Sequence, residues 1–421
     1  MKKFVTALLI IILTASSVLL SSRSRKIKYL SFREYVFGIG DQLIPLEATL
    51  YGINIKYLRN ARDEILDVLG DLNAELNTAD NESVITKFNN YGSDGQDFNP
   101  NEKFYVSKHA YHMLKYAKEL HENENGLLNI DGEEINAYEL FNPAIYPLME
   151  LWELDAKNYD ENELEEDKER KIPTSAEIQE ALKYIDYSKV QIGEDEKGYY
   201  ITKDDRNIKI DLGGQAKGYA ADLAVDICKK YYLKGAIINI GGNVYVYKTK
   251  PLAGGGAQKF TVGLKMPVTS EHKYFCAILA EDTSLVTSGD YVRYFTYDIK
   301  DGNETRTIKY AHILSPFTGL PVNIKRTGED ASSDTFDNTG LTSVTIINKS
   351  SELADICATI VMLLGMENGI KFMEKNGLTG VLISHDKKYA AVGNVEITEH
   401  KLGYEDYQPY ELDGKVYGFN K

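Results

Sequence analysis

The sequence predicts an α+β fold, with helices and strands mixed along one chain. Some segments place apolar residues at the spacing of a buried helix face, and others alternate apolar and polar residues as a half-buried strand does. A chain of 421 residues with 43% hydrophobic content can bury a full core, and this length allows one large domain or two closely associated ones. We find no internal repeat that would indicate a solenoid or a propeller.

Residues 1–28 predict an export signal or a membrane anchor ahead of the body, residues 29–421. Lys2 and Lys3 precede the uncharged stretch Phe4–Ser22, and basic residues follow it. The stretch is near the lower limit of about 20 residues for a spanning helix, so an uncleaved anchor is favoured and a cleaved signal stays open. The basic start places the body on the extracytoplasmic face of the cell membrane, or outside the cell after cleavage.

The first half of the body is expected to hold strands and then helices. Residues 29–60 are β-like, with alternation clearest over Ala48–Ile55, and helices are expected at Ala61–Leu76 and Ser107–His121. A dense mixed-charge run then predicts a solvated insertion around residues 153–171.

The second half alternates between the two element types. Pro173 and Thr174 indicate the entry to a helix. The expected helices are Ser175–Tyr184, Gly218–Tyr232 and Glu352–Lys375, the last broken near Gly365 to Glu367. The expected strands are Lys189–Ile192, Tyr199–Ile210, Gly235–Val246, Val381–Ser384 and Tyr389–Val392.

Composition limits the partners. A formal charge of -15 and a pI near 5.1 argue against a nucleic-acid partner, since binding a phosphate backbone needs a basic patch. An anionic ligand must therefore be bound by a local group of residues, not by the overall charge of the chain. Cys228, Cys276 and Cys357 show no spacing suited to zinc or to a disulfide framework, so we expect buried, unreactive side chains.

The junction Asp211–Gly218 (DLGGQAKG) predicts a phosphate-binding turn. Its paired glycines allow close approach of the backbone to a ligand, and the following helix points amides at negative charge. Lys217 could pair with that phosphate. A tight turn with an exposed lysine explains the segment equally well.

A second glycine pair, Gly241 and Gly242, ends an apolar strand in Asn239–Asn243 (NIGGN). It could bring another backbone segment to the same ligand, although a buried β-turn explains it as well.

His312 is a candidate catalytic base. It ends a predicted strand and faces a Pro- and Gly-rich turn that carries Thr318, which places a neutral base and a hydroxyl on a loop. A purely structural histidine is the alternative.

Asp355 and Thr359 lie at positions i and i+4 of a predicted helix and therefore share one face. Two oxygen-bearing side chains at this spacing suit a hard cation that keeps several waters. A solvent-facing pair is the alternative.

Taken in order, these segments resemble the FAD:protein FMN transferase family, also called ApbE. Further matches in the expected sequence extend the resemblance from about Ser31 to Thr398: Asn77–Ser83 (NTADNES) through Asn89, Phe141–Trp152 (FNPAIYPLMELW) and Lys171–Thr174 (KIPT). The resemblance implies a single large ApbE-like domain related to the T-fold.

The resemblance also implies a site. Magnesium would be held by the carbonyl of Gly214 and the side chains of Asp355 and Thr359, with the carbonyl of Ala358 close by. Asp211, Lys217 and Ile313 would contact FAD.

The implied reaction transfers FMN from FAD to a threonine or serine hydroxyl and releases AMP, with His312 taking the hydroxyl proton. No stretch resembles an acceptor site, so the acceptor is expected to be another protein, such as an extracytoplasmic or membrane redox subunit. An FAD pyrophosphatase and a non-catalytic flavin-binding protein are the alternative functions.

Three positions depart from the family pattern and bear on FAD affinity. Ala79 stands where an aromatic residue is usual, and Ser315 stands where an aspartate is usual. Asn142 occupies the position of another usual aspartate, with Asn129 as the other candidate for that position.

Overall fold

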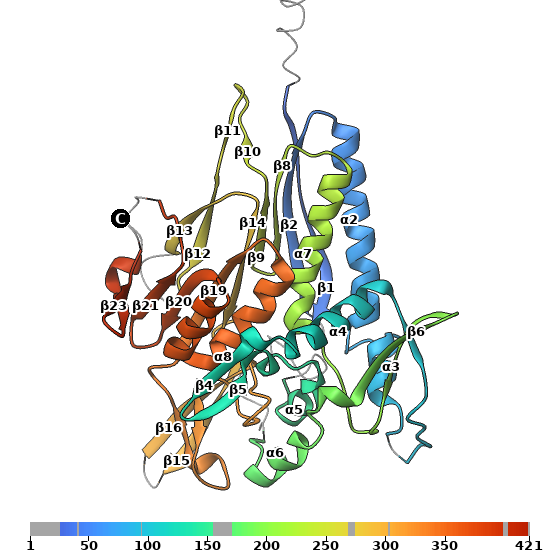
Figure 1. Ribbon diagram of the computed structural model, residues 1–421, viewed down its shortest axis with the longest axis vertical. Coiled ribbons are helices and arrows are strands. Elements are labelled where there is room, and N and C mark those ends of the chain that lie inside the picture. Colours follow the sequence, from blue (N-terminus) through green and yellow to red (C-terminus); the bar gives the residue numbers. More distant parts are fainter. Residues whose placement is uncertain are drawn as a thin grey trace, which may run out of the picture.

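The computed structural model of the chain describes residues 26–39, 42–93, 95–154, 171–267, 274–301, 304–398 and 403–419. Residues 1–25 of the predicted signal or anchor and residues 155–170 of the predicted charged insertion lie outside the described residues. The remainder mixes helices and strands and confirms the α+β class (Figure 1).

Ten of the described strands form one sheet, in the order β1-β2-β8-β9-β14-β19-β20-β21-β22-β23. Neighbouring strands run antiparallel except β21 and β22, which are parallel. The strands are β1 (Lys28–Ile39), β2 (Gln42–Gly52), β8 (Gly235–Ile240), β9 (Asn243–Tyr247), β14 (Thr283–Gly289), β19 (Leu341–Asn348), β20 (Thr379–Ser384), β21 (Lys388–Val392), β22 (Gln408–Leu412) and β23 (Lys415–Tyr417).

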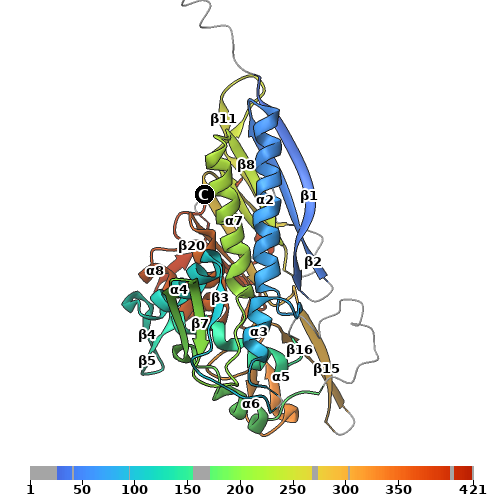
Figure 2. The same ribbon diagram turned by 90° about the vertical axis from the view of Figure 1, so that its right-hand side faces the viewer.

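Long helices cover one face of this sheet. Helices α2 (Ile55–Leu76) and α7 (Gly213–Lys230) run side by side against β1, β2, β8 and β9 (Figures 1 and 2). Leu58, Ile65, Leu69 and Leu72 recur at helical spacing along α2 and are buried in the main core. Helix α4 (Lys108–His121) adds to the same layer.

Helix α8 (Ser351–Lys375) packs against α7 and against β14 and β19. Gly365 breaks the helix with a φ of 75°, as the sequence predicts. Among the described helices, α8 is long and apolar enough to cross a membrane, but 67% of its apolar window is buried inside the fold. This burial is typical of a core helix.

The opposite face of the sheet carries a second core. Side chains alternate along each strand, so Val286 and Leu382 join the helix-side core whereas Leu285 and Val381 face the other way. There they pack with the hairpin β12 (Phe260–Lys265) and β13 (Tyr274–Ala280).

A third cluster is built around Trp152, which packs on Tyr310. Helices α5 (Tyr146–Leu151) and α6 (Ser175–Leu182) and the hairpin β15 (Tyr294–Asp301) and β16 (Glu304–Ala311) supply it. The elements α5, α6, β15 and β16 that contribute to it lie together at one end of the molecule (Figure 1). The remaining elements are short: α3 (Val84–Asn90), β3 (Phe104–Val106), β4 (Leu127–Ile130), β5 (Glu133–Asn136), β6 (Val190–Asp195), β7 (Gly198–Lys203), β10 (Lys250–Pro251), β11 (Ala257–Gln258), β17 (Ile324–Arg326) and β18 (Asp334–Phe336).

Several element boundaries differ from the predictions. Helix α2 begins at Ile55, six residues before the expected start, because the Asn54 side chain caps it by accepting a hydrogen bond from the Lys56 amide. The strand expected over Gly235–Val246 is a hairpin, since Gly241 and Gly242 turn with φ values of 57° and 96°.

One predicted strand is too long, and the prediction for the cysteines is confirmed. The strand expected over Tyr199–Ile210 ends at Lys203. All three cysteines are buried and free, as expected.

Candidate functional site

A cavity of about 660 Å³ opens where the sequence motifs converge. Its walls come from β1, β2, the C-terminal end of α2, the segment 140–149, the start of α7, the β8–β9 turn, the segments 288–293 and 312–314, and α8. A cavity of this size is typical of small-molecule and cofactor sites.

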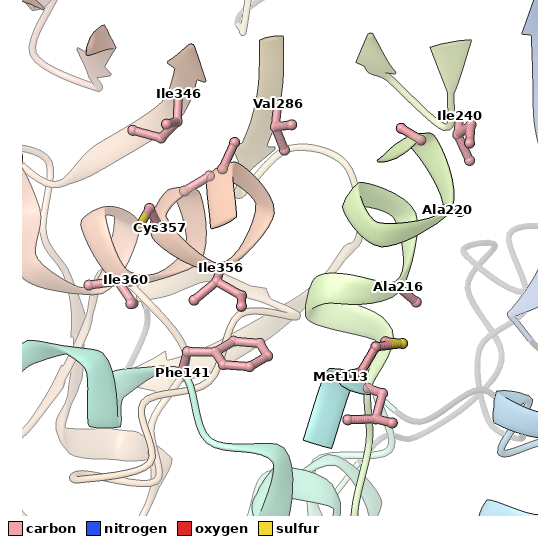
Figure 3. Packing of buried hydrophobic residues seen from close by; sticks show 14 of the residues in the cluster. Met113, Phe141, Ala216, Ala220, Ile240, Val286, Ile346, Ile356, Cys357 and Ile360 are labelled. Carbon is pink, nitrogen blue, oxygen red and sulfur yellow. The ribbon is translucent and has the colours of Figure 1, made fainter. Parts of the chain in front are cut away.

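The start of α7 forms one wall of the cavity. The Asp211 side chain accepts a hydrogen bond from the Gly213 amide at 2.8 Å, and this turn starts the helix. Gly213 and Gly214 both line the cavity, so the positive end of the helix dipole lies at its surface. A Cβ on Gly214 would come within 2.9 Å of the Phe141 ring, which packs beside Ile356 of α8 in Figure 3.

Lys217 and Asp355 meet at the crossing of α7 and α8. The Lys217 Nζ lies 3.6 Å from the Asp355 carboxylate, whose side chain is 3% exposed. The same carboxylate oxygen accepts a hydrogen bond from the Gly218 amide at 2.9 Å. Thr359 lies one turn further along α8 and lines the same cavity. A cation, a carboxylate and a hydroxyl therefore share one wall.

His312 lies on another wall of the cavity, directly after β16. Its Nδ1 lies 3.0 Å from the carbonyl oxygen of Arg293, and a carbonyl can only accept. The proton therefore sits on Nδ1, and Nε2 is left as the basic nitrogen. Burial, followed by the positive charge of Arg293, lowers the pKa of His312 to about 3, so the imidazole is neutral at physiological pH.

The described lining carries more positive than negative side chains. The cations are Arg33, Lys217 and Arg293, and the carboxylates are Asp211 and Asp355. In a chain of formal charge -15, this local excess and the helix dipole suit an anionic ligand.

All twelve predicted site residues are described, and nine of them line the cavity: His312, Asp211, Lys217, Ile313, Asn142, Gly241, Gly214, Asp355 and Thr359. Gly242 lies in the β8–β9 turn and Ala358 is buried within α8, and neither lines the cavity.

Thr318 does not reach the cavity either. It is exposed on a loop, where its hydroxyl accepts a hydrogen bond from the Leu320 amide. Ser315 shapes that loop by accepting from the amides of Phe317 and Thr318. Asn142 lines the cavity, whereas the other candidate, Asn129, is exposed in the β4–β5 hairpin.

Arg33 and Tyr35 are lining residues that the sequence analysis did not identify. They lie two residues apart on β1, and the Arg33 guanidinium lies 5.8 Å from the centre of the Tyr35 ring. Their alternation along a predicted strand indicates a shared face, but no motif links this strand to the cavity.

The donor set of Asp355, Thr359 and Gly214 fits magnesium. All three offer oxygen, which Mg²⁺ prefers while keeping waters or taking phosphate oxygens. The described residues contain no cluster of three or more His, Cys, Asp or Glu side chains that could hold a metal.

Relatives of the chain carry a common name. An FAD:protein FMN transferase of Vibrio cholerae is 25% identical over 349 residues, which cover 80% of this chain and 85% of that protein. An FAD:protein FMN transferase of Klebsiella pneumoniae is 30% identical over 229 residues, which cover 54% of this chain and 58% of that protein.

Solved structures share the fold. The flavin transferase ApbE of Vibrio cholerae superposes with a TM-score of 0.62 at 20% identity, covering 90% of this chain and 99% of that one. The ApbE protein of Thermotoga maritima gives 0.62 at 25% identity, covering 91% and 100%. The model of the ApbE family matches residues 47–382, so this chain belongs to the ApbE family.

Proposed function

We propose that this chain is an FAD:protein FMN transferase that uses Mg²⁺. The hydroxyl oxygen of an acceptor threonine or serine attacks the phosphorus of the FMN half of FAD. A phosphoester bond forms to the acceptor, the bond between the two phosphates breaks, and AMP leaves. The hydroxyl proton passes to His312.

One observation carries this proposal: the cavity joins a neutral base to a cationic wall. His312 supplies the base, and Lys217 together with the start of α7 supplies the positive charge. A pyrophosphate needs such charge when a phosphoryl group is transferred, and an attacking hydroxyl needs an acceptor for its proton.

The base, the positive groups and the proposed magnesium ligands each have a defined task in this reaction. Nε2 of His312 accepts the acceptor's proton, because Nδ1 is held by the Arg293 carbonyl. Lys217 binds the diphosphate as a point charge. The amide end of α7, at Gly213 and Gly214, faces the same negative charge. Asp355, Thr359 and Gly214 would hold magnesium, which supplies positive charge to the diphosphate and to the departing phosphate.

The acceptor is another protein on the extracytoplasmic side, such as a membrane redox subunit. This part of the proposal rests on the sequence of residues 1–28, whose basic start and apolar run are typical of an export signal or an anchor.

The test incubates the purified full-length chain with FAD, Mg²⁺ and a carrier protein bearing an acceptor threonine, and follows carrier mass and AMP by mass spectrometry. An FMN adduct that His312→Ala and Asp355→Ala both abolish is the expected result. AMP and free FMN without an adduct would instead identify an FAD pyrophosphatase, and FAD binding without turnover would identify a flavin-binding protein.

A further inference from the structure

We infer that Asp290 is a positioning residue for His312: its buried carboxylate fixes the turn whose carbonyl oxygen orients the imidazole. The inference rests on the proposed function of His312 as the base. Asp290 does not line the cavity, and it positions His312 through the backbone between residues 290 and 293.

The carboxylate of Asp290 is fully buried and collects donors from separate elements. Among the described residues, four side chains contact it: His385 Nε2 at 2.6 Å, Lys309 Nζ at 3.0 Å, Asn323 Nδ2 at 3.0 Å and Thr342 Oγ1 at 3.0 Å. A carboxylate with no exposure needs such partners to stay ionised, and His385 and Lys309 hold the pKa of Asp290 below its usual value against the effect of burial.

These contacts anchor one end of a short turn. Asp290 follows β14 directly, and its own amide donates to the carbonyl of Thr342 on β19 at 3.2 Å. Three residues later, the Arg293 guanidinium donates to the carbonyl of Leu154 at 2.8 Å. The turn is thus held at both ends.

The Arg293 carbonyl at the end of this turn contacts His312 twice. It accepts from the His312 backbone amide at 3.1 Å and lies 3.0 Å from Nδ1. One oxygen therefore fixes both the backbone position and the tautomer of the base. A shift of this carbonyl would release Nδ1 and leave Nε2 without a defined direction, and misplacement of a reacting group by about 1 Å costs about 100-fold in rate.

Asp334 provides a matched control. It is also fully buried, and its carboxylate binds Arg326 at 2.5 and 2.7 Å and the Tyr310 hydroxyl at 2.7 Å. Asp334→Asn neutralises a comparable buried carboxylate in the β17–β18 hairpin, and its partners Arg326 and Tyr310 lie outside the 290–293 turn.

The experiment compares the full-length wild type, Asp290→Asn, Thr342→Val and Asp334→Asn in the FMN-transfer assay with FAD. We expect Asp290→Asn to lower kcat by about 10- to 100-fold with KM for FAD within about threefold, because the base is misplaced while Lys217 and the start of α7 are intact. Thr342→Val keeps the charge of Asp290 and removes one donor, so a smaller loss of kcat is expected. Asp334→Asn should stay within about threefold of the wild type.

A second readout follows the imidazole itself. Selective ¹⁵N-histidine labelling, assigned with His312→Gln, should show a protonated Nδ1 for His312 in the wild type and in Asp334→Asn. This signal should be lost or averaged in Asp290→Asn.

An unchanged kcat and His312 signal in Asp290→Asn would overturn the inference, as would an equal loss of kcat in Asp334→Asn. If Asp290→Asn does not fold, Thr342→Val carries the test on the same two readouts. A wild type that forms no adduct would refute the proposed function alone, since the ¹⁵N comparison still decides whether Asp290 orients His312.

Discussion

Replacing Gly218 with alanine tests whether the crossing of α7 and α8 places Asp355 in the cavity wall. A Cβ at this position would lie 2.3 Å from the carbonyl oxygen of Ser351 and 2.9 Å from the Cβ of Asp355. The first of these is a backbone atom that cannot rotate away. The Gly218 amide, moreover, donates to the Asp355 carboxylate at 2.9 Å. The two helices must therefore separate, and this hydrogen bond must lengthen.

The expected cost follows from these contacts. Overpacking a close contact costs about 1–3 kcal/mol, and losing a hydrogen bond to a charged group costs about 1.5–3 kcal/mol. The higher helix propensity of alanine relative to glycine offsets about 1 kcal/mol of this loss in the free energy of unfolding. We expect a net loss of about 2–5 kcal/mol in the free energy of unfolding, together with weaker magnesium-dependent turnover.

Urea denaturation and the FMN-transfer assay measure both effects, and Gly70→Ala serves as the control. Gly70 is exposed within α2, and no described heavy atom lies within 4 Å of a Cβ placed there. Gly70→Ala should stabilise the protein by about 0.5–1 kcal/mol and leave turnover unchanged. If Gly218→Ala behaves like Gly70→Ala in both assays, the reasoning about the helix crossing is wrong.

Four further predictions concern the cavity and its support. Tyr35 is half-exposed on the cavity wall, so Tyr35→Ala should raise the Kd for FAD by about 2- to 10-fold in a fluorescence titration, and an unchanged Kd would contradict an aromatic contact. Lys203 is buried and donates to three backbone carbonyls, so Lys203→Met should lower the free energy of unfolding by about 2–5 kcal/mol in urea, whereas a loss below about 1 kcal/mol would argue against this role. Because the lowered pKa of about 3 keeps His312 neutral, kcat/KM should not fall with a midpoint near 6.5 as the pH drops from about 8 to about 5, and such a midpoint would indicate an ordinary histidine. EDTA should stop AMP release, and Asp355→Asn should raise the Mg²⁺ concentration for half-maximal turnover by at least about 10-fold, an expectation that metal-independent turnover would refute.

Local sequence was enough to predict most of the elements near the site. The helix over residues 351–375 and its break at Gly365 follow from an apolar pattern and a glycine, because both act over a few residues. Pro173 and Thr174 likewise indicate the start of α6, where the Thr174 side chain caps the helix. The predicted boundaries were wrong where a single polar side chain or a turn sets the end of an element. Asn54, which caps the start of α2, is an example.

The order of the motifs along the chain determined the family and the candidate residues, but their meeting in one cavity is a property of the tertiary structure. Gly218 and Asp355 are 137 residues apart and are joined by one hydrogen bond. Arg33 lines the cavity although its edge strand carries no motif. Thr318 lies close to the His312 motif in sequence, but its hydroxyl accepts a hydrogen bond within its own turn. Periodicity reports which face of an element is buried, while the partner across that face depends on packing between distant segments.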